Sequence, residues 1–227
     1  MLNGHIHPKD KFIPELALEL CKYAISCYQN YNIQTANATA LHIEESDYQI
    51  LSIAGSDDII DWIQNAETVK VSRTGMGRIH NGFADYWAQL KPYVLERLNK
   101  NKPIYFGSHS LGGSVSKIIA LYLKQRGYNV VCVYSFGAPR TGNLDWQNAY
   151  ESAEIPTFRF VNGRDIVPNV PKVFFYHVGI AIYMDDGKIL EFQKEWYFSL
   201  FLWQASCDRV SDHFKLNYLD SIQKLIM

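Results

Sequence analysis

A run of small residues between an apolar segment and an amphipathic segment restricts the fold of this chain more than any other feature of its sequence. Residues 103–107 have the composition of a short buried strand, and from Leu111 to Gln125 apolar residues recur at helical spacing up to Gly127. The segment Ser108 to Ser110 must therefore turn the chain from a strand directly into a helix. Such a strand–turn–helix unit is typical of α/β folds.

Strand-like and helix-like segments alternate on both sides of this unit. Apolar periodicity and turn residues predict helices over 14–30, 82–99 and 214–225. The same criteria predict strands at 40–43, 48–54, 67–72, 129–136, 157–162, 173–179, 180–184 and 188–192. This alternation favours a mainly parallel sheet covered by helices on both faces. We therefore expect a three-layer α/β/α fold.

Composition supports one ordinary globular domain. The chain has 227 residues, of which 48% are hydrophobic and 20% charged, and we expect a single domain over residues 1–227. The 22 basic and 23 acidic residues nearly cancel, which excludes the basic field that nucleic-acid binding requires. No apolar stretch approaches the length of a transmembrane helix, and the longest candidate is Trp196 to Trp203.

Three further features concern the location of the protein, the state of its cysteines and metal binding. Met1 to Phe12 has no apolar stretch of signal-peptide length, which favours a cytoplasmic over a secreted location. The four cysteines are expected to be free and buried. The pair Asp57 and Asp58 has no histidine or cysteine at ligand spacing, and we expect neither a metal nor a cofactor.

Ser110 is the candidate nucleophile of the turn. A serine hydroxyl reacts only when it is exposed by the backbone, given a base, and faced by donors for an oxyanion. The turn that exposes it is so sharp that the residues two before and two after must be small, as in G-x-S-x-G. Here these positions hold Ser108 and Gly112, so serine replaces the leading glycine. The alternative is that Ser110 only caps the following helix.

Several separate stretches resemble the class 3, fungal-type triacylglycerol lipases. The segment 108–114 is similar to their nucleophile turn, and 134–143 to the segment after their next strand. Residues 159–168, from Arg159 to Pro168, resemble their catalytic-aspartate segment. Residues 79–83 resemble their V-H-x-G-F motif, and 53–56 with 61–63 their oxyanion and lid segment. The resemblance implies an α/β-hydrolase fold.

The resemblance also implies roles for individual residues. Asp165 would be the acid of a catalytic triad, which suits a carboxylate on a loop after a strand. The order Ser, Asp, His then requires a later histidine, and His213 matches the family position, with His177 as the alternative. The oxyanion would be held by the backbone N–H groups of Leu111 and Ser56.

One departure from the family pattern and two further segments carry expectations. Ala54 stands where the family commonly has an arginine, so we expect the loop around Ser56 to be anchored differently. The segment 57–65, with Ile59, Ile60 and Trp62, suits an amphipathic lid, or alternatively an ordinary surface helix. The aromatic run 196–203 suits an acyl-chain pocket, or alternatively plain core.

These features favour a serine carboxylic-ester hydrolase, with a lipase cleaving acylglycerols as the family expectation. The expected partner is a lipid or other acyl ester, met at a lipid–water interface. A short-chain carboxylesterase is the close rival. A catalytically silent lipid-binding module is the alternative from a different class, because the turn is altered at Ser108 and the arginine is replaced at Ala54.

Overall fold

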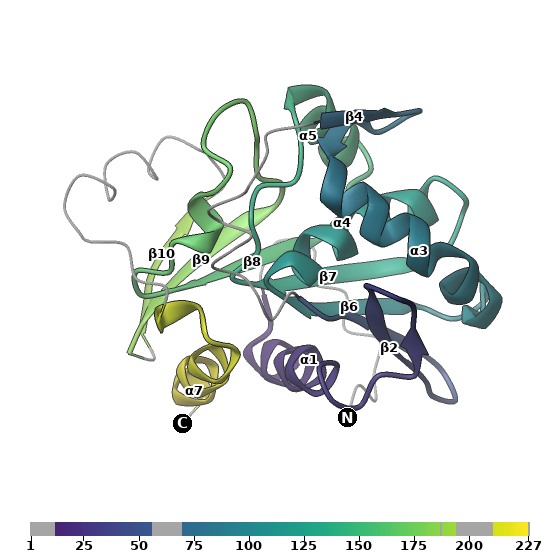
Figure 1. Cartoon of the computed structure of the whole chain (residues 1–227). Coiled ribbons are helices and arrows are strands. Elements are labelled where there is room, and N and C mark those ends of the chain that lie inside the picture. The colour runs from purple at the N-terminus through teal and green to yellow at the C-terminus, as the bar shows by residue number, and fades with distance from the viewer. Residues whose placement is uncertain (1–11, 56–69, 187, 194–210, 227) are drawn as a thin grey trace.

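The computed structural model describes residues 12–55, 70–186, 188–193 and 211–226, and an eight-stranded sheet runs through them (Figure 1). The strand order is β1-β2-β3-β6-β7-β8-β9-β10. The strands are β1 (Ile33–Gln34), β2 (Thr39–Glu44), β3 (Gln49–Ile53), β6 (Ile104–His109), β7 (Val130–Phe136), β8 (Thr157–Asn162), β9 (Ile180–Asp185) and β10 (Lys188–Gln193). A separate antiparallel hairpin joins β4 (Lys70–Arg73) to β5 (Gly77–His80).

The centre of the large sheet is parallel. Strands β3, β6, β7, β8 and β9 pair in parallel, whereas β1, β2 and β10 add antiparallel pairs at the two edges. Parallel neighbours end at the same edge of a sheet, so the loops after β6, β7 and β8 lie close together. The residues that follow these three strands include Ser110 and Asp165.

Helices cover both faces of the sheet (Figure 1). One face carries α1 (Pro14–Ser26) and α7 (Lys215–Ile226), and the other carries α3 (Asn81–Arg97), α4 (Leu111–Lys124) and α5 (Leu144–Glu151). Each face has its own hydrophobic core, one around α3 and α4 and one around α1 and α7. The expected mainly parallel three-layer fold is confirmed.

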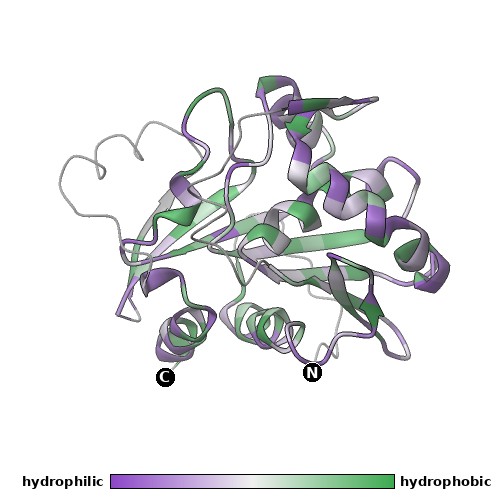
Figure 2. Ribbon diagram, in the orientation of Figure 1, coloured by the Kyte–Doolittle hydropathy of each residue, from purple (hydrophilic) through white to green (hydrophobic). Residues whose placement is uncertain are grey.

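The burial of the central strands explains why their sequences are mainly apolar. Every residue of β3, β6 and β7 is buried, because helices cover them on both faces. Figure 2 shows β7 largely in the colour of hydrophobic residues, while the helices carry much of the polar colour. The strand and helix on either side of Ser110 are therefore fixed by the two cores.

Some predicted elements are wrong or were missed. The expected strand 173–179 is irregular: its Tyr176 forms only an isolated bridge with Gly142, and Phe174 has φ +57°, outside the extended range. The hairpin strand β5 was not among the predicted strands. Helix α5 was missed, although Asn143 caps it by accepting a hydrogen bond from the backbone N–H of Trp146 at 3.1 Å.

Other expectations concern single residues and the chain as a whole. Cys21, Cys27 and Cys132 are free and buried, and Cys207 lies outside the described residues. Among the helices that the structure describes, none combines the length and apolar character needed to cross a membrane. The aromatic run 196–203 lies outside the described residues, and the single domain over 1–227 stays a prediction.

Candidate active site

Ser110 occupies a strained turn between β6 and α4. Its backbone has φ +58° and ψ −135°, a region that non-glycine residues rarely adopt. The turn is fixed because the Ser110 N–H donates to the carbonyl of Phe136 on the neighbouring strand, at 2.8 Å. No side-chain hydrogen bond from Ser110 caps α4. The hydroxyl is thus directed away from the helix and is available for another partner.

Both small positions of the turn face the end of strand β3. A Cβ on Gly112, the second residue of α4, would collide with the carbonyl oxygen of Ile53, so this position requires glycine. Ser108 is fully buried, and its hydroxyl oxygen accepts a hydrogen bond from the Ile53 N–H at 2.9 Å. It also bonds the Ser116 hydroxyl at 2.7 Å. The serine that replaces the expected glycine is therefore fully hydrogen-bonded.

The structure brings Ser110, His213 and Asp165 together. The His213 Nε2 atom lies 2.9 Å from the Ser110 Oγ, and its Nδ1 lies 2.8 Å from Oδ2 of Asp165. All three residues are buried. Because a carboxylate only accepts, Nδ1 carries the proton in neutral His213, and Nε2 accepts from the serine hydroxyl. An imidazole and a carboxylate thus stand in line with the serine hydroxyl.

Further bonds fix the carboxylate of Asp165. Its Oδ2 also accepts from the Tyr218 hydroxyl at 2.6 Å, and its Oδ1 accepts from the Val167 N–H at 2.9 Å. Burial, followed by the negative charge of Asp165, raises the pKa of Tyr218 well above its usual value, which keeps the phenol protonated as a donor. Gly137 leaves room for the pair, since a Cβ there would come within 3.0 Å of both Asp165 and His213 atoms.

A second histidine holds the backbone of the first. The Nε2–H of His109 donates to the carbonyl of His213 at 2.8 Å, so its Nδ1 must accept from the Tyr28 hydroxyl, 3.0 Å away. Burial, and then the neighbouring His213, hold the pKa of His109 well below its usual value. Neutral His109 therefore connects the end of helix α1 to the candidate base.

The loop expected to hold the oxyanion begins beside Ser110. A Cβ on Gly55 would lie 2.9 Å from the Ser110 Cβ. The Ala54 carbonyl, where the family commonly has an arginine, accepts from the Tyr86 hydroxyl at 3.0 Å, so a tyrosine of α3 holds this strand end. Leu111 is the first residue of α4, and its N–H has no intrahelical acceptor. Ser56 and the lid residues Ile59, Ile60 and Trp62 lie outside the described residues.

His177 does not join this group of side chains. Its Nε2 lies 2.7 Å from the carbonyl of Pro168, to which it donates. Burial lowers the pKa of His177 well below its usual value, and the positive charges of Arg159, Arg140 and Lys117 lower it further. The position next to Ser110 and Asp165 is held by His213.

Sequence reasoning missed three contributors to this site: Tyr28, Tyr218 and the role of His109. His109 stands inside the turn motif, where the motif specifies no residue type, and Tyr218 lies in the segment resembling the family's histidine region. Tyr28 follows α1 and has no local signal. Among the described residues, no three histidine, cysteine, aspartate or glutamate side chains gather as a metal site.

Comparison with known proteins identifies the family of this chain. The sequence model of the family described as Lipase (class 3) matches residues 50–175, which is more than half of the chain. The chain belongs to the class 3 lipase family. The matched residues include the Ser110 turn, the Gly55 loop and the Asp165 segment.

Three relatives illustrate the range of this family. The chain is 40% identical over 84 residues to phospholipase A1-II 1 of Oryza sativa, covering 35% of this chain and 21% of the relative. It is 29% identical over 151 residues to secreted mono- and diacylglycerol lipase 1 of Fusarium solani, covering 62% and 45%. It is 33% identical over 148 residues to a lipase of Rhizomucor miehei, covering 59% and 40%. The chain thus matches less than half the length of each.

The fold agrees with the solved triacylglyceride lipase of Rhizomucor miehei, with a TM-score of 0.75 and 23% identity over 88% of this chain and 91% of that one. This confirms the α/β-hydrolase fold. One expectation is corrected: the preference for a cytoplasmic location is contradicted, because the class 3 relative from Fusarium solani is named as secreted. A missing signal-like segment is weak ground for a compartment.

Proposed function

We propose that this class 3 lipase family member is a serine ester hydrolase that cleaves acyl esters of glycerol through an acyl-enzyme on Ser110. The observation that carries the proposal is the line of contacts from Ser110 Oγ to His213 Nε2 and from His213 Nδ1 to Asp165, at 2.9 and 2.8 Å. A buried serine, histidine and carboxylate in this order supply a nucleophile, its base and the group that orients the base.

In the first half-reaction the Ser110 Oγ attacks the ester carbonyl carbon while its proton passes to His213 Nε2. Asp165 holds the imidazole in the required tautomer and stabilises its charged form. The developing oxyanion accepts hydrogen bonds from the Leu111 N–H and from the N–H of Ser56, on the loop that begins at Gly55. The proton on His213 then goes to the departing alcohol, and the acyl group remains on Ser110.

In the second half-reaction water replaces the alcohol. The water oxygen attacks the acyl carbon while His213 takes a proton from the water. His213 then gives this proton to Ser110 Oγ as the carboxylic acid leaves. No metal or cofactor takes part in these steps. His109 acts as a positioning residue, because it holds the backbone carbonyl of His213.

Acylglycerols are the proposed substrates because relatives are named as mono- and diacylglycerol lipase and as lipase. The proposed site of action is a lipid–water interface, with residues 57–65 as the lid. A silent lipid-binding module gains no support, since its function would not need the aligned serine, histidine and aspartate. A short-chain carboxylesterase shares the same chemistry and differs only in the length of the acyl chain.

Hydrolysis of p-nitrophenyl esters from acetate to palmitate tests the proposal. We expect turnover by the wild type, with the highest kcat/KM on a medium or long acyl chain. A maximum at acetate with no cleavage of an emulsified acylglycerol would favour the carboxylesterase. Absence of turnover on every ester would contradict the proposed function.

A further inference from the structure

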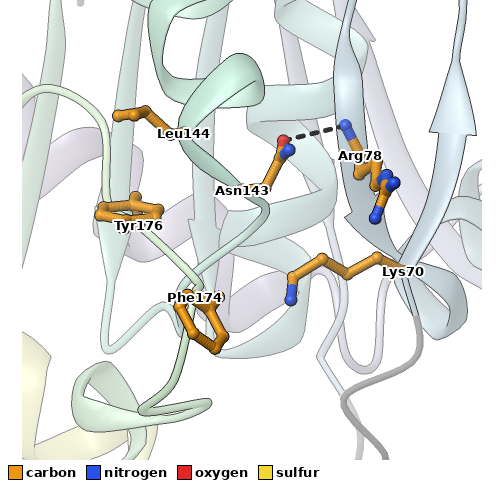
Figure 3. Close-up of a pocket in the computed structure, with 6 residues that line it drawn as sticks. All are labelled: Lys70, Arg78, Asn143, Leu144, Phe174 and Tyr176. Carbon is orange, nitrogen blue, oxygen red and sulfur yellow. Dashed lines mark hydrogen bonds between the residues drawn. The ribbon is translucent and has the colours of Figure 1, made fainter.

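A pocket of about 310 Å³ lies outside the Ser110 site (Figure 3). Its walls come from three segments: the β4–β5 hairpin, the loop that enters α5, and residues 174–176. The lining residues are Lys70, Arg78, Asn143, Leu144, Phe174 and Tyr176. The loop that enters α5 follows β7, and residues 174–176 follow the Asp165 loop. The pocket is therefore built on the same edge of the sheet as the candidate active site.

Backbone hydrogen bonds join these walls to one another. The Tyr176 N–H donates to the Gly142 carbonyl at 2.7 Å, and the Asn143 N–H donates to the Arg78 carbonyl at 2.9 Å. The Asn143 Oδ1 in turn accepts from the Arg78 N–H at 3.0 Å. Because the three segments are held by the main chain, the pocket is formed before any ligand enters.

The charge of the pocket is positive. Lys70 and Arg78 both line it, and no carboxylate does. Among the described residues neither of these cations forms an ion pair. The nearby Asp145 carboxylate accepts from the Asn143 amide at 2.8 Å instead. Burial, and then the positive charge of Arg78, lower the pKa of Lys70, as expected for two cations that share a site.

The opposite wall is aromatic and apolar. Phe174 is 72% exposed and Leu144 50% exposed, so this side presents an apolar surface to solvent. The Phe174 backbone has φ +57°, a strained conformation for a bulky residue and one that recurs at ligand sites. The Lys70 Nζ lies 5.9 Å from the centre of the Phe174 ring, which places the cation beside the apolar wall (Figure 3).

A ligand that satisfies both walls must carry an anionic group next to apolar carbon atoms. We propose that this pocket binds the phosphate of a glycerophospholipid, with Lys70 and Arg78 on the phosphate oxygens and Phe174 and Leu144 on the acyl-glycerol part. This deepens the proposed ester hydrolysis, on which it rests, because it adds phospholipids to the lipids that the protein takes. Arginine and lysine are suited to phosphate through charge-assisted hydrogen bonds.

Binding is measured by titration calorimetry in the Ser110→Ala protein, which prevents hydrolysis. The probes are monomeric dihexanoylphosphatidylglycerol, uncharged dihexanoylglycerol and inorganic phosphate. We expect Lys70→Gln with Arg78→Gln to weaken phospholipid binding by about tenfold or more, because two charge-assisted contacts are lost. The matched control removes two exposed lysines elsewhere, by Lys22→Gln with Lys124→Gln, and should bind as the parent does.

Further binding measurements distinguish a phospholipid site from a site for inorganic phosphate. Phe174→Ala should weaken phospholipid binding and leave the binding of inorganic phosphate unchanged. Equal weakening in the pocket and control variants, or none in either, would overturn the proposal. Binding of inorganic phosphate as tight as that of the phospholipid would overturn the lipid assignment. The pocket variant with Ser110 intact should hydrolyse p-nitrophenyl butyrate as fast as the wild type does. If neither protein hydrolyses this ester, the proposed ester hydrolysis is contradicted, whereas the binding proposal is judged by the calorimetry.

Discussion

The Ser108 hydroxyl oxygen accepts a hydrogen bond from the backbone N–H of Ile53 at 2.9 Å. This bond joins the strand before the nucleophile turn to the strand that leads into the Gly55 loop. It extends the contact between β3 and β6 beyond their last paired residues, Leu51 and Phe106. A glycine at this position could not supply it, so the altered turn motif has a structural explanation.

Replacing Ser108 by glycine should therefore destabilise the protein rather than activate it. Ser108→Gly leaves the buried Ile53 N–H without its acceptor, and we expect a loss of about 1–3 kcal/mol in the free energy of unfolding. Urea denaturation measures it, with Ser116→Ala as the control that keeps the Ile53 bond. A Ser108→Gly protein as stable as the wild type and more active would show that the serine impairs the turn.

The two histidines near the Asp165 loop should differ sharply when replaced. His213→Ala removes the base beside Ser110, and kcat on p-nitrophenyl butyrate should fall by about 10⁴-fold or more. His177→Ala loses only the bond to the Pro168 carbonyl and should retain most of the activity. The reverse pattern would assign the base to His177.

His177 should instead contribute to acid sensitivity. Its pKa in the folded protein lies well below its usual value, so below pH about 6.5 the unfolded chain binds a proton that the folded chain does not. Stability is unaffected above that pH and falls as the pH decreases below it, by up to about 1.4 kcal/mol per pH unit for this group. His177→Gln, compared with wild type by urea denaturation at pH 7.5 and 5, should lose less stability on acidification. Equal losses would contradict the assignment of a neutral, buried ring.

Lys117 is fully buried, and its amine has no hydrogen-bond partner among the described residues. Burial, and then the charge of Arg159, lower its pKa well below the usual value, so the unfolded chain binds the additional proton at every pH between the folded value and about 10.4. Lys117→Met should raise the free energy of unfolding by about 1–3 kcal/mol at pH 7, and by less as the pH approaches 10. The exposed Lys124→Met on the same helix is the control. A destabilised Lys117→Met protein would indicate that the amine has a partner.

The sequence predicts the elements that are long and strongly patterned. The β6–α4 unit was predicted within two residues because burial on both faces makes the first half of β6, residues 104–106, apolar, and helical periodicity marks α4. The expected strand 173–179 was wrong because only the backbone of Tyr176 is paired, through hydrogen bonds with Thr141 and Gly142 of the preceding loop and not with a strand of the large sheet. Some of its apolar residues line the pocket described above, and others, such as Phe175 and Val178, are buried. This use of apolar residues gives the segment the composition of a strand.

The site was predictable only where motifs specify residue types. Ser110 was predicted from the turn motif, Asp165 and His213 from the resemblance to class 3 lipases, and the structure brings the three side chains into contact. Tyr28 was not predictable, because its contact with His109 joins residues 81 positions apart and depends on how α1 packs against the sheet. The same holds for the positive pocket, because Lys70 and Arg78 belong to a hairpin outside the large sheet and meet the other walls only through tertiary contacts.

Covalent labelling tests the central claim, that Ser110 is the nucleophile, most directly. The wild-type protein is treated with diethyl p-nitrophenyl phosphate, which phosphorylates an activated serine, and the modified peptide is identified by mass spectrometry. We expect one label per chain, on Ser110, with loss of esterase activity in the same proportion, and little labelling in His213→Ala because the proposed base is absent. Labelling of a different residue, or full esterase activity in Ser110→Ala, would contradict it.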